Sequence, residues 1–362
     1  MKKLYSGVYQ NTKVLVTGHT GFKGTWLVSW LNLLGAKVYG IALSPETTPN
    51  HFDLLSPDCN SKILDINDAN LLDQTIKDIQ PTIIFHLAAQ ALVRKSYTNP
   101  LETLQTNIMG TANLLNSCRD LQSLEAVVVV TSDKCYENKE WIWGYREDEA
   151  MGGHDPYSAS KGATELITSS FRQSYFHSEN SPLISTARAG NVVGGGDWSE
   201  DRLIPDLVKN ANQSKATLIR NPLATRPWQH VLEPLSGYLQ LGEKLLQKKK
   251  EFAQAYNFGP HPENTQTVET IVKVAHSYWS KVTTCSDSST QPHEAQLLSL
   301  DSSKAKQQLK WHTVWDLDQT FEKTIQWYKN YYESKSIHTK DQIHQYVSDA
   351  TKKKLSWTQN YE

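Results

Sequence analysis

Two side chains with chemistry of their own stand four residues apart in the segment YSASK, at Tyr157 and Lys161. Positions i and i+4 share one face of a helix, so the ammonium can lie near the phenol oxygen and lower the pKa of the phenol. A phenolate is a base for the hydroxyl of a sugar or an alcohol. The same spacing occurs on many helices that have no catalytic role, so its meaning depends on the elements around it.

A glycine-rich stretch, TGHTGFKG, directly follows an expected strand and leads into an expected helix. Its glycines permit a tight turn and let backbone amides approach a pyrophosphate at the N-terminus of the helix. The stretch lacks the Gly-Lys-Ser/Thr ending of a nucleoside-triphosphate loop. A turn without a ligand is the alternative, but the strand–loop–helix context favours a dinucleotide-binding loop. The residues expected to contact the dinucleotide are Gly18, Thr20, Gly21, Phe22, Lys23 and Gly24.

The choice between NAD and NADP is weakly marked in the sequence. The second strand of a dinucleotide-binding fold usually ends in an acid that binds the adenosine ribose. Here it ends in ALSPET, where Glu46 comes late and no Arg or Lys follows to favour a 2′-phosphate. Asp65, which closes the third strand before Ile66, could face the adenine instead, and its alternative role is to cap the next helix.

The order of the elements predicts the fold class. Strands are expected over 13–18, 37–43, 62–66, 81–89, 126–132 and 183–190, and helices near 21–34, 67–79, 100–121 and 156–174. Strands that alternate with helices of this length pair in parallel through right-handed crossovers. The strands are nearly continuous apolar runs, as expected when both sheet faces are covered. We therefore predict an α/β protein with a Rossmann-type doubly wound parallel sheet and a smaller C-terminal substrate-binding domain.

The pattern loosens after Gly190. Segments rich in Gly, Pro and Trp, such as GGGDWSEDRLIPD, predict binding loops between short helices. A later unit over 300–332 pairs a helix capped by Asp301 or Ser302 with a longer amphipathic helix. We expect a dinucleotide-binding domain over 1–190 and a mainly substrate-binding domain over 191–335, with some segments returning to the first. Residues 336–362 are expected to form a polar, peripheral tail.

The composition excludes several classes of protein. The chain has 362 residues, of which 38% are apolar and 21% charged, as is typical of soluble globular proteins. A net charge of −1 gives no general attraction to nucleic acid or to an anionic membrane. The basic start has no apolar stretch behind it, so it does not resemble a secretory signal. Scattered cysteines without CxxC, and histidines without HExxH, predict free thiols in the cytoplasm and no metal site.

The order of the remaining motifs resembles that of a known family. HLAAQ (86–90), TNIMGTANLL (106–115) and RAGNVVGGGDW (188–198), together with the glycine loop and YSASK, resemble the extended short-chain dehydrogenase/reductase family over nearly the whole chain. TSDKCYENKEWIWGYRED and LATRPWQHVLEPLSGYL (223–239) are similar to nucleotide-sugar 4,6-dehydratases, most of all to those acting on CDP-glucose. Asp133 and Lys134 stand where the thymidine-type enzymes carry an Asp-Glu pair.

This resemblance implies an internal redox cycle with NAD that converts CDP-D-glucose into CDP-4-keto-6-deoxy-D-glucose and water. It implies that Tyr157, assisted by Lys161 and Ser132, takes the proton of the C4 hydroxyl while the C4 hydride passes to NAD. Asp133 is expected to protonate the leaving C6 hydroxyl, and Lys134 to remove the C5 proton or to act as its electrostatic partner. Burial would have to keep Asp133 protonated, but an adjacent cation opposes this, so the division stays open. A surface salt bridge between the two is the alternative.

The resemblance also implies contacts with each ligand. The further cofactor contacts are Tyr157, Lys161, Asp65, Ile66, Leu87, Ala88 and Ala89. The nucleotide-sugar contacts are Asn107, Asn191, Arg202, Arg226 and Trp228. Arg226 could instead pair with Glu233, and positions in the core suit Asn107, Trp198 and Trp228 equally well. His86 and His154 are expected to be structural.

Other functions compete with this interpretation. A nucleotide-sugar 4-epimerase or reductase needs the same tyrosine, lysine and glycines but not the Asp-Lys pair. A non-catalytic dinucleotide-binding protein would not need Tyr157 or Lys161, and both are present. A dehydratase acting on another nucleotide sugar would differ mainly in the second half of the chain. The resemblance further implies a homodimer, or a homotetramer, that pairs the helices at 100–121 and 156–174.

Overall fold

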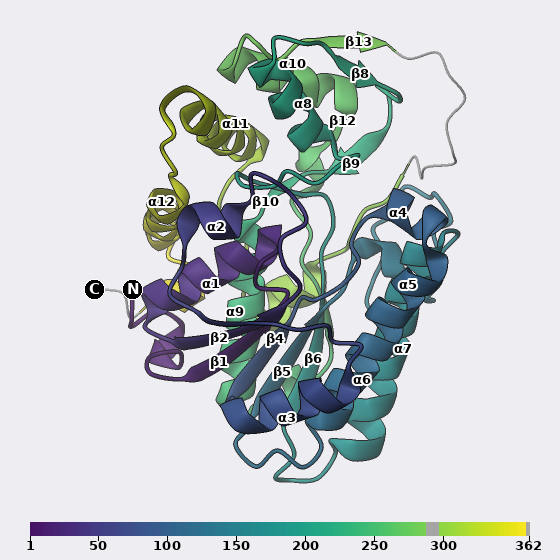
Figure 1. Cartoon of the computed structure of the whole chain (residues 1–362), viewed down its shortest axis with the longest axis vertical. Coiled ribbons are helices and arrows are strands. Elements are labelled where there is room, and N and C mark those ends of the chain that lie inside the picture. The colour runs from purple at the N-terminus through teal and green to yellow at the C-terminus, as the bar shows by residue number, and fades with distance from the viewer. Residues whose placement is uncertain (287–296, 360–362) are drawn as a thin grey trace.

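A seven-stranded parallel sheet forms the centre of the computed structural model, which describes residues 1–286 and 297–359 (Figure 1). From one edge to the other its strands are β11 (Ala255–Asn257), β6 (Leu183–Arg188), β5 (Ala126–Val130), β4 (Ile83–His86), β1 (Lys13–Thr17), β2 (Lys37–Ala42) and β3 (Asn60–Ile63). Because β1 pairs with β4 on one side and β2 on the other, the strand order reverses there, which is where sheets of this kind have their ligand crevice, outside the carboxyl ends of the strands. The expected doubly wound sheet is confirmed.

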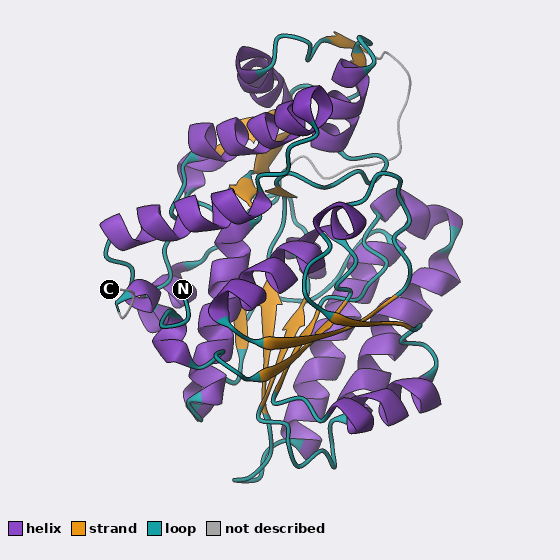
Figure 2. Cartoon of the chain, turned by 60° about the vertical axis from the view of Figure 1, so that its left-hand side comes forward, coloured by secondary structure: helices purple, strands orange, loops and turns teal. Residues whose placement is uncertain are grey.

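Helices cover both faces of the sheet (Figure 2). One face carries α1 (Phe22–Leu34), the short α2 (His51–Leu55) beside it and α9 (Leu232–Leu246), and the other carries α3 (Ala69–Ile79), α6 (Gly110–Ser117) and α7 (Pro156–Tyr175). Successive side chains of a strand point to opposite faces. Val14 and Val16 therefore enter the core beneath α1 and α9, whereas Leu15 enters the core on the other side. Two apolar cores explain the nearly continuous apolar strands.

The helix expected near 100–121 is a helical run with a π-helical segment inside it. α5 (Pro100–Leu104), the π-helical segment η2 (Gln105–Met109) and α6 follow one another directly, and α4 (Val93–Thr98) precedes them. Asn107 lies in η2, and its backbone carbonyl accepts hydrogen bonds from the hydroxyls of Thr111 and Thr164. Because Thr164 belongs to α7, this segment is fastened to the helix that carries YSASK.

The third strand ends earlier than expected. It covers Asn60–Ile63 rather than 62–66, and the chain then turns, with the Asp68 amide donating a hydrogen bond to the Asp65 carbonyl. The apolar residues Leu64 and Ile66 are buried beyond the strand, in the core of α3 and α6. Apolar character alone could not distinguish these loop positions from strand positions.

A second region occupies the upper part of Figure 1, beyond the carboxyl edge of the sheet. Its elements are β7 (Val192–Val193), α8 (Leu203–Asn212), β8 (Thr217–Ile219), β9 (Thr225–Pro227), β10 (Gln229–His230), β12 (Thr265–Thr267), α10 (Val268–Tyr278), β13 (Thr284–Ser286) and α11 (Leu317–Ser334). The strands pair two by two, β7 with β10, β8 with β13 and β9 with β12. Since α9 and β11 fall between these elements in sequence but pack in or against the large sheet, the chain crosses between the two regions more than once.

The end of the chain is packed, contrary to the expected peripheral tail. α12 (Thr339–Lys352) lies against α1 and buries Ile343, Tyr346, Val347 and Ala350. These residues recur at steps of three and four, which is the apolar stripe of an amphipathic helix. The expectation was wrong because the polar residues of this segment, among them the lysines at both ends of the helix, hide the stripe in the overall composition.

The glycine loop owes its shape to two close approaches. Gly18 has φ +75°, and a Cβ there would lie 2.7 Å from the amide nitrogen of Ala88. A Cβ at Gly24, in the first turn of α1, would lie 2.0 Å from the carbonyl oxygen of Gly18. Gly21, between them, has room for a Cβ, whose nearest neighbour would be 3.4 Å away. Helix and loop therefore touch backbone to backbone at Gly24, and only glycine allows this.

We expect Gly24→Ala to lower the free energy of unfolding by about 3 kcal/mol, because the new methyl group must displace backbone rather than a flexible side chain. Gly21→Ala is the matched control and should cost about 1 kcal/mol or less. Chemical denaturation of both variants beside the parent protein measures the difference. Equal stabilities of the two variants would contradict the packing described for this loop.

Candidate active site

The glycine loop presents open backbone at the crevice. Gly21 precedes α1 and no side chain caps the helix there, so its first amides face outward without a capping partner. The Thr20 hydroxyl donates a hydrogen bond of 2.9 Å to the carbonyl of Leu43, which ties the loop to the end of β2. The Ala88 amide approaches Gly18 closely, so the end of β4 borders the same space. Open amides beside missing side chains fit a pyrophosphate group.

The other expected cofactor residues lie along the same edge of the sheet. Phe22 and Lys23 are half-buried in the first turn of α1, and 87–89, directly after β4, are half-buried as well. Asp65 is exposed and accepts a hydrogen bond of 2.9 Å from the Asn67 amide, whereas Asp68 caps α3. Ile66 is buried. Asp68, not Asp65, therefore caps this helix.

Three polar residues follow β5 at the crevice. The Ser132 hydroxyl donates a hydrogen bond of 2.8 Å to Asp133 Oδ1 and accepts one of 3.2 Å from the Lys134 amide, at the start of the 3-10 turn η3 (Asp133–Cys135). The Asn191 amide donates to Asp133 Oδ2 at 3.2 Å. A Cβ at Gly190 would lie 1.8 Å from that oxygen, so glycine leaves the space that the carboxylate fills. Asp133 is buried and fixed by Ser132 and Asn191, which does not fit a surface salt bridge.

Tyr157 and Lys161 lie in the first two turns of α7, 8% and 6% exposed, with the Lys161 ammonium 6.0 Å from the centre of the phenol ring. Burial raises the pKa of Tyr157 to about 12, and the charge of Asp133 acts in the same direction, against a hydrogen bond with Ser132 and the charge of Arg202. Burial also lowers the pKa of Lys161 to about 8. The expected lowering of the phenol pKa is therefore wrong for the chain by itself, because burial outweighs the hydrogen bond with Ser132 and the charge of Arg202.

Two further cations face the same volume. Arg202, which precedes α8, forms an ion pair of 2.9 Å with Asp197; burial opposes its charge, but Asp197 raises its pKa above the usual value. Burial lowers the pKa of Lys23 to about 8, the charges of Arg202 and Lys161 act in the same direction, and Asp133 acts against them. Lys23 thus lies within reach of two other positive charges, those of Lys161 and Arg202, and of the Asp133 carboxylate. Such a cluster suits phosphate oxygens.

Asn107 occupies a different place from the expected substrate contact. Its side chain accepts a hydrogen bond of 2.8 Å from the Gln90 amide and donates to the Gln90 carbonyl at 3.0 Å and to Ser160 Oγ at 2.8 Å. The residue is buried, so its amide is used within the protein. The alternative of a polar core residue fits, and through Ser160 it braces the turn of α7 between Tyr157 and Lys161.

The residues expected to contact the nucleotide in the second region differ in their burial. Trp228 is buried in the larger core, and its indole donates a hydrogen bond of 3.2 Å to the Gln266 carbonyl, which fits its alternative role in packing. Trp198 is buried in the same core. Arg226 is half-buried on β9. Its alternative partner, Glu233, is buried and accepts hydrogen bonds from the Tyr346 hydroxyl and two backbone amides instead.

Sequence reasoning missed two buried charges behind the site. Glu165 and Arg188 form an ion pair of 2.8 Å in which each side chain is only 4% exposed. Glu165 stands four residues after Lys161 on the same helix, and Arg188 ends the otherwise uncharged strand LISTAR. Two features of the sequence could have indicated this pair: a charge at the end of a buried strand, and an acid one helical turn beyond Lys161.

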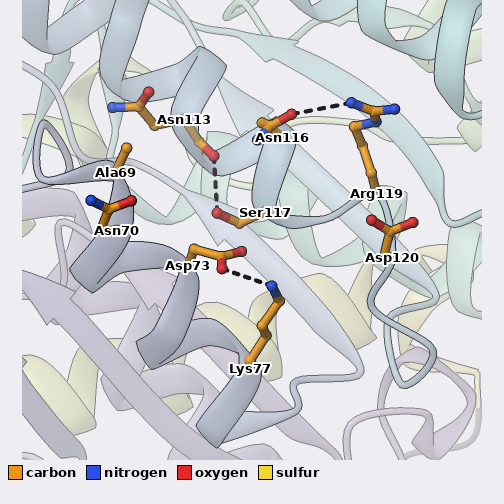
Figure 3. A pocket seen from close by; sticks show the side chains of 9 residues that line it. All are labelled: Ala69, Asn70, Asp73, Lys77, Asn113, Asn116, Ser117, Arg119 and Asp120. Carbon is orange, nitrogen blue, oxygen red and sulfur yellow. Dashed lines mark hydrogen bonds and ion pairs between the residues drawn. The ribbon is translucent and has the colours of Figure 1, made fainter.

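A polar hollow between α3 and α6 is lined by side chains such as Asp73, Asn113 and Arg119 (Figure 3). Asp73 is paired with Lys77 at 2.7 Å, and Arg119 lies near Asn116. The hollow contains none of the residues expected to bind a ligand or to react. The candidate active site therefore remains the crevice at the carboxyl ends of β1, β4 and β5.

His86, at the end of β4, is neutral and structural, as expected. Its ring nitrogens share hydrogen bonds of 2.7 Å with Thr17 and 3.0 Å with Thr111. Burial lowers the pKa of His86 to about 3, and the charge of Lys161 acts in the same direction. His154 lies exposed before α7.

Comparison with known sequences shows similarity to nucleotide-sugar 4,6-dehydratases. The family described as "GDP-mannose 4,6 dehydratase" matches residues 15–324. The CDP-glucose 4,6-dehydratase of Salmonella typhimurium is 46% identical over 353 residues, which cover 95% of this chain and 98% of that protein. The dTDP-glucose 4,6-dehydratase of the same organism is 25% identical, over 87% of this chain and 92% of that protein.

The fold also matches solved structures. A dTDP-glucose 4,6-dehydratase from Streptomyces venezuelae, solved with NAD bound, superposes with a TM-score of 0.74 at 22% identity and covers 88% of this chain and 97% of its own. At this identity the likeness concerns the fold alone.

We expect His86→Gln to reduce the acid sensitivity of the fold. In the parent protein His86 stays neutral when folded but binds a proton when unfolded below its usual pKa of about 6.5, so stability present above that pH is lost as the pH falls toward 3. Between pH 7.5 and 5.0 this linkage costs about 2 kcal/mol, which a glutamine would not incur. Urea unfolding at both pH values measures the difference. The same pH-dependent loss in both proteins would contradict a buried neutral histidine.

Proposed function

Because the chain belongs to the GDP-mannose 4,6 dehydratase family, we propose that it is a hydro-lyase that converts CDP-D-glucose into CDP-4-keto-6-deoxy-D-glucose and water, with NAD as its resident cofactor. The observation that carries the proposal is the meeting of Ser132, Asp133 and Lys134 with Tyr157 and Lys161 at one end of the sheet. The identity to a CDP-glucose 4,6-dehydratase supports this choice of nucleotide sugar. The keto-deoxysugar would serve deoxysugar or cell-surface polysaccharide synthesis.

NAD, when bound, supplies a hydride acceptor and a positive charge. The amides at the start of α1, with Gly18, Gly21 and Gly24, would hold its pyrophosphate. Lys161 would hydrogen-bond to it, since its ammonium forms no hydrogen bond or ion pair within the described parts of the chain. The absence of an acid at the end of β2 leaves the adenosine ribose to Asp65 or to backbone groups.

Proton transfer from the C4 hydroxyl falls to Tyr157. The buried phenol needs positive charge nearby to ionise, because burial holds its pKa near 12 in the chain alone. Lys161 supplies one such charge, and it remains protonated below about pH 8. The Ser132 hydroxyl, which donates to Asp133 in the chain alone, would turn to donate its hydrogen bond to the oxygen of the same sugar hydroxyl.

Loss of water from C5 and C6 falls to Asp133 and Lys134. A ketone at C4 acidifies the C5 proton, since the carbanion is delocalised as an enolate. Asp133, buried and held by Ser132 and Asn191, would protonate the leaving C6 hydroxyl. Lys134 would take the C5 proton or stabilise the enolate.

Nucleotide binding would fall to residues 191–335 and dinucleotide binding to 1–190. Arg202 and Lys23 offer charges for the diphosphate of the sugar nucleotide, and Asn191 lies beside Asp133 at the boundary. Arg226, half-buried on β9, is a further candidate. The packing of Trp228 favours a supporting role rather than direct contact.

We further propose a homodimer in the cytoplasm. Leu101 of α5, Met109 of η2 and Leu166 of α7 are exposed by 79%, 46% and 61%, an unusual set of large apolar side chains on helices that pack together. The cysteines of the described chain are free thiols, which suits a reducing compartment. No described helix has both the length and the apolar character to span a bilayer.

We expect the purified protein to convert CDP-D-glucose into a product lighter by one water, with the alkaline ultraviolet absorbance of a 4-keto-6-deoxy sugar. Tyr157→Phe should lower turnover by about 100- to 10,000-fold, because the C4 proton loses its acceptor. Tyr175→Phe, at an exposed position of the same helix, is the matched control and should leave turnover unchanged. UDP-, GDP- and dTDP-glucose, assayed side by side, test the choice of base.

Two outcomes would overturn the assignment. Formation of CDP-galactose without loss of water would indicate a 4-epimerase. Full turnover in Tyr157→Phe would remove the phenol from the reaction and leave the protein without its proposed base.

We expect Leu166→Arg to yield monomers, since a charge on the exposed face of α7 cannot be buried against a partner helix. Leu218→Arg, at a 49% exposed position on β8 in the second region, is the matched control and should leave the dimer intact. Sedimentation velocity at several concentrations measures both. A parent protein that is already monomeric would refute the proposed interface.

A further inference from the structure

A buried ion pair lies directly behind the candidate catalytic residues. Glu165 of α7 and Arg188 at the end of β6 are joined at 2.8 Å, each 4% exposed. Burial alone would raise the pKa of Glu165, but the charge of Arg188 and hydrogen bonds hold that pKa below its usual value. Glu165 therefore stays ionised at neutral pH in the interior of the protein.

Hydrogen bonds from three elements converge on this pair. Glu165 accepts hydrogen bonds from the hydroxyls of Thr131 and Thr186, the latter at 2.7 Å, in addition to that from Arg188. Arg188 donates at 2.6 Å to the hydroxyl of Tyr136. Thr131 directly precedes Ser132 and Asp133, and Tyr136 directly follows η3, so the pair fixes both ends of the segment that carries the proposed acid.

Glu165 is also the acid one helical turn beyond Lys161. Positions i and i+4 lie on the same face of a helix, and without forming an ion pair the charge of Glu165 supports that of Lys161 against burial. Within residues 1–286 and 297–359 the Lys161 side chain has no hydrogen bond or ion pair, and its ammonium lies 6.0 Å from the centre of the Tyr157 ring.

The remaining groups around Lys161 carry no compensating negative charge at neutral pH. Tyr157 on the same helix and Cys135 of η3 are neutral, because burial raises the pKa of the phenol to about 12 and that of the thiol well above its usual value. His86 of β4 is neutral, since burial lowers its pKa to about 3. Lys23 of α1 adds a positive charge. Asp133 is not among the charges that act on Lys161, so Glu165 stands alone as the anion that supports it.

We infer that Glu165 is a positioning residue of the proposed reaction, which keeps Lys161 protonated beside Tyr157 and holds the Ser132–Asp133 segment through Thr131. This inference rests on the proposed function for its purpose, but the effect on Lys161 is a property of the chain alone. Arg188 serves to keep the acid ionised, since a carboxylate without that partner would take up a proton in the interior.

Competitive labelling of the amines tests the inference without substrate. A trace of acetic anhydride is applied over a range of pH, and the extent of reaction of the Lys161 peptide is measured by mass spectrometry. In Glu165→Gln we expect the titration midpoint of Lys161 to fall by about one pH unit, because a glutamine keeps the hydrogen-bonding shape but not the charge. Turnover should lose its alkaline limb at a correspondingly lower pH.

Glu147→Gln is the matched control. Glu147 is a half-buried acid near Arg188 and Lys304 whose carboxylate accepts a hydrogen bond of 2.8 Å from the Asn257 amide, and its charge is not among those that act on Lys161. The Lys161 midpoint should stay at its parent value in this variant. Glu165→Asp, which keeps the charge, should restore the midpoint even if it lowers the rate.

Removal of Glu165 alone leaves Arg188 buried without its partner, so a second variant guards against loss of folding. The double substitution Glu165→Gln with Arg188→Met removes both charges and should show the same fall in the Lys161 midpoint. A midpoint that equals the parent value in a folded Glu165→Gln or double variant would overturn the inference. A shifted midpoint in a protein that fails to act on any nucleotide sugar would uphold it and refute the proposed function.

Discussion

The arrangement of the candidate site depends on one constraint: the phenol of Tyr157 and the ammonium of Lys161 are buried side by side. Each group loses hydration in the interior, and the loss disfavours the charged form of both, so the pKa of Tyr157 rises to about 12 and that of Lys161 falls to about 8. A phenolate can form near neutral pH only if positive charge is brought close to it. The surrounding structure keeps the charge of Lys161 in place, and NAD would bring a second positive charge when it binds.

Two buried networks hold this pair from opposite sides. Asn107 links the loop after β4 to Ser160, within the same turn of α7 as the reacting groups. The Glu165–Arg188 pair links α7 to the end of β5 and to β6. Between these braces, Asp133 is fixed by its neighbours and by the space left at Gly190. The proposed chemistry is thus placed on rigid elements rather than on mobile loops.

The sequence was sufficient for the fold and for the meeting of the candidate residues at one edge of the sheet, because both follow from short-range patterns. The apolar runs and the glycine loop specify a parallel sheet with open amides at one edge, and YSASK follows the fifth strand as such a site requires. The effects of burial could not be predicted from the sequence. Neither the raised pKa of Tyr157 nor the inward placement of Asn107 and Trp228 follows from spacing, since both depend on which atoms pack around the residue in three dimensions. α12 was misjudged for a related reason, as its apolar stripe is visible only when the residues are placed on a helix.

The transfer of hydrogen within one sugar is the central claim, and isotope labelling tests it most directly. CDP-D-glucose carrying deuterium at C4 is mixed with unlabelled substrate that carries carbon-13 in the ring, and the product is examined by mass spectrometry and NMR. The account predicts deuterium at C6 of the product, confined to molecules without carbon-13, because Tyr157 and Lys161 act on a single buried sugar throughout. Deuterium lost to water, or shared between the two populations, would contradict an internal redox cycle at this site.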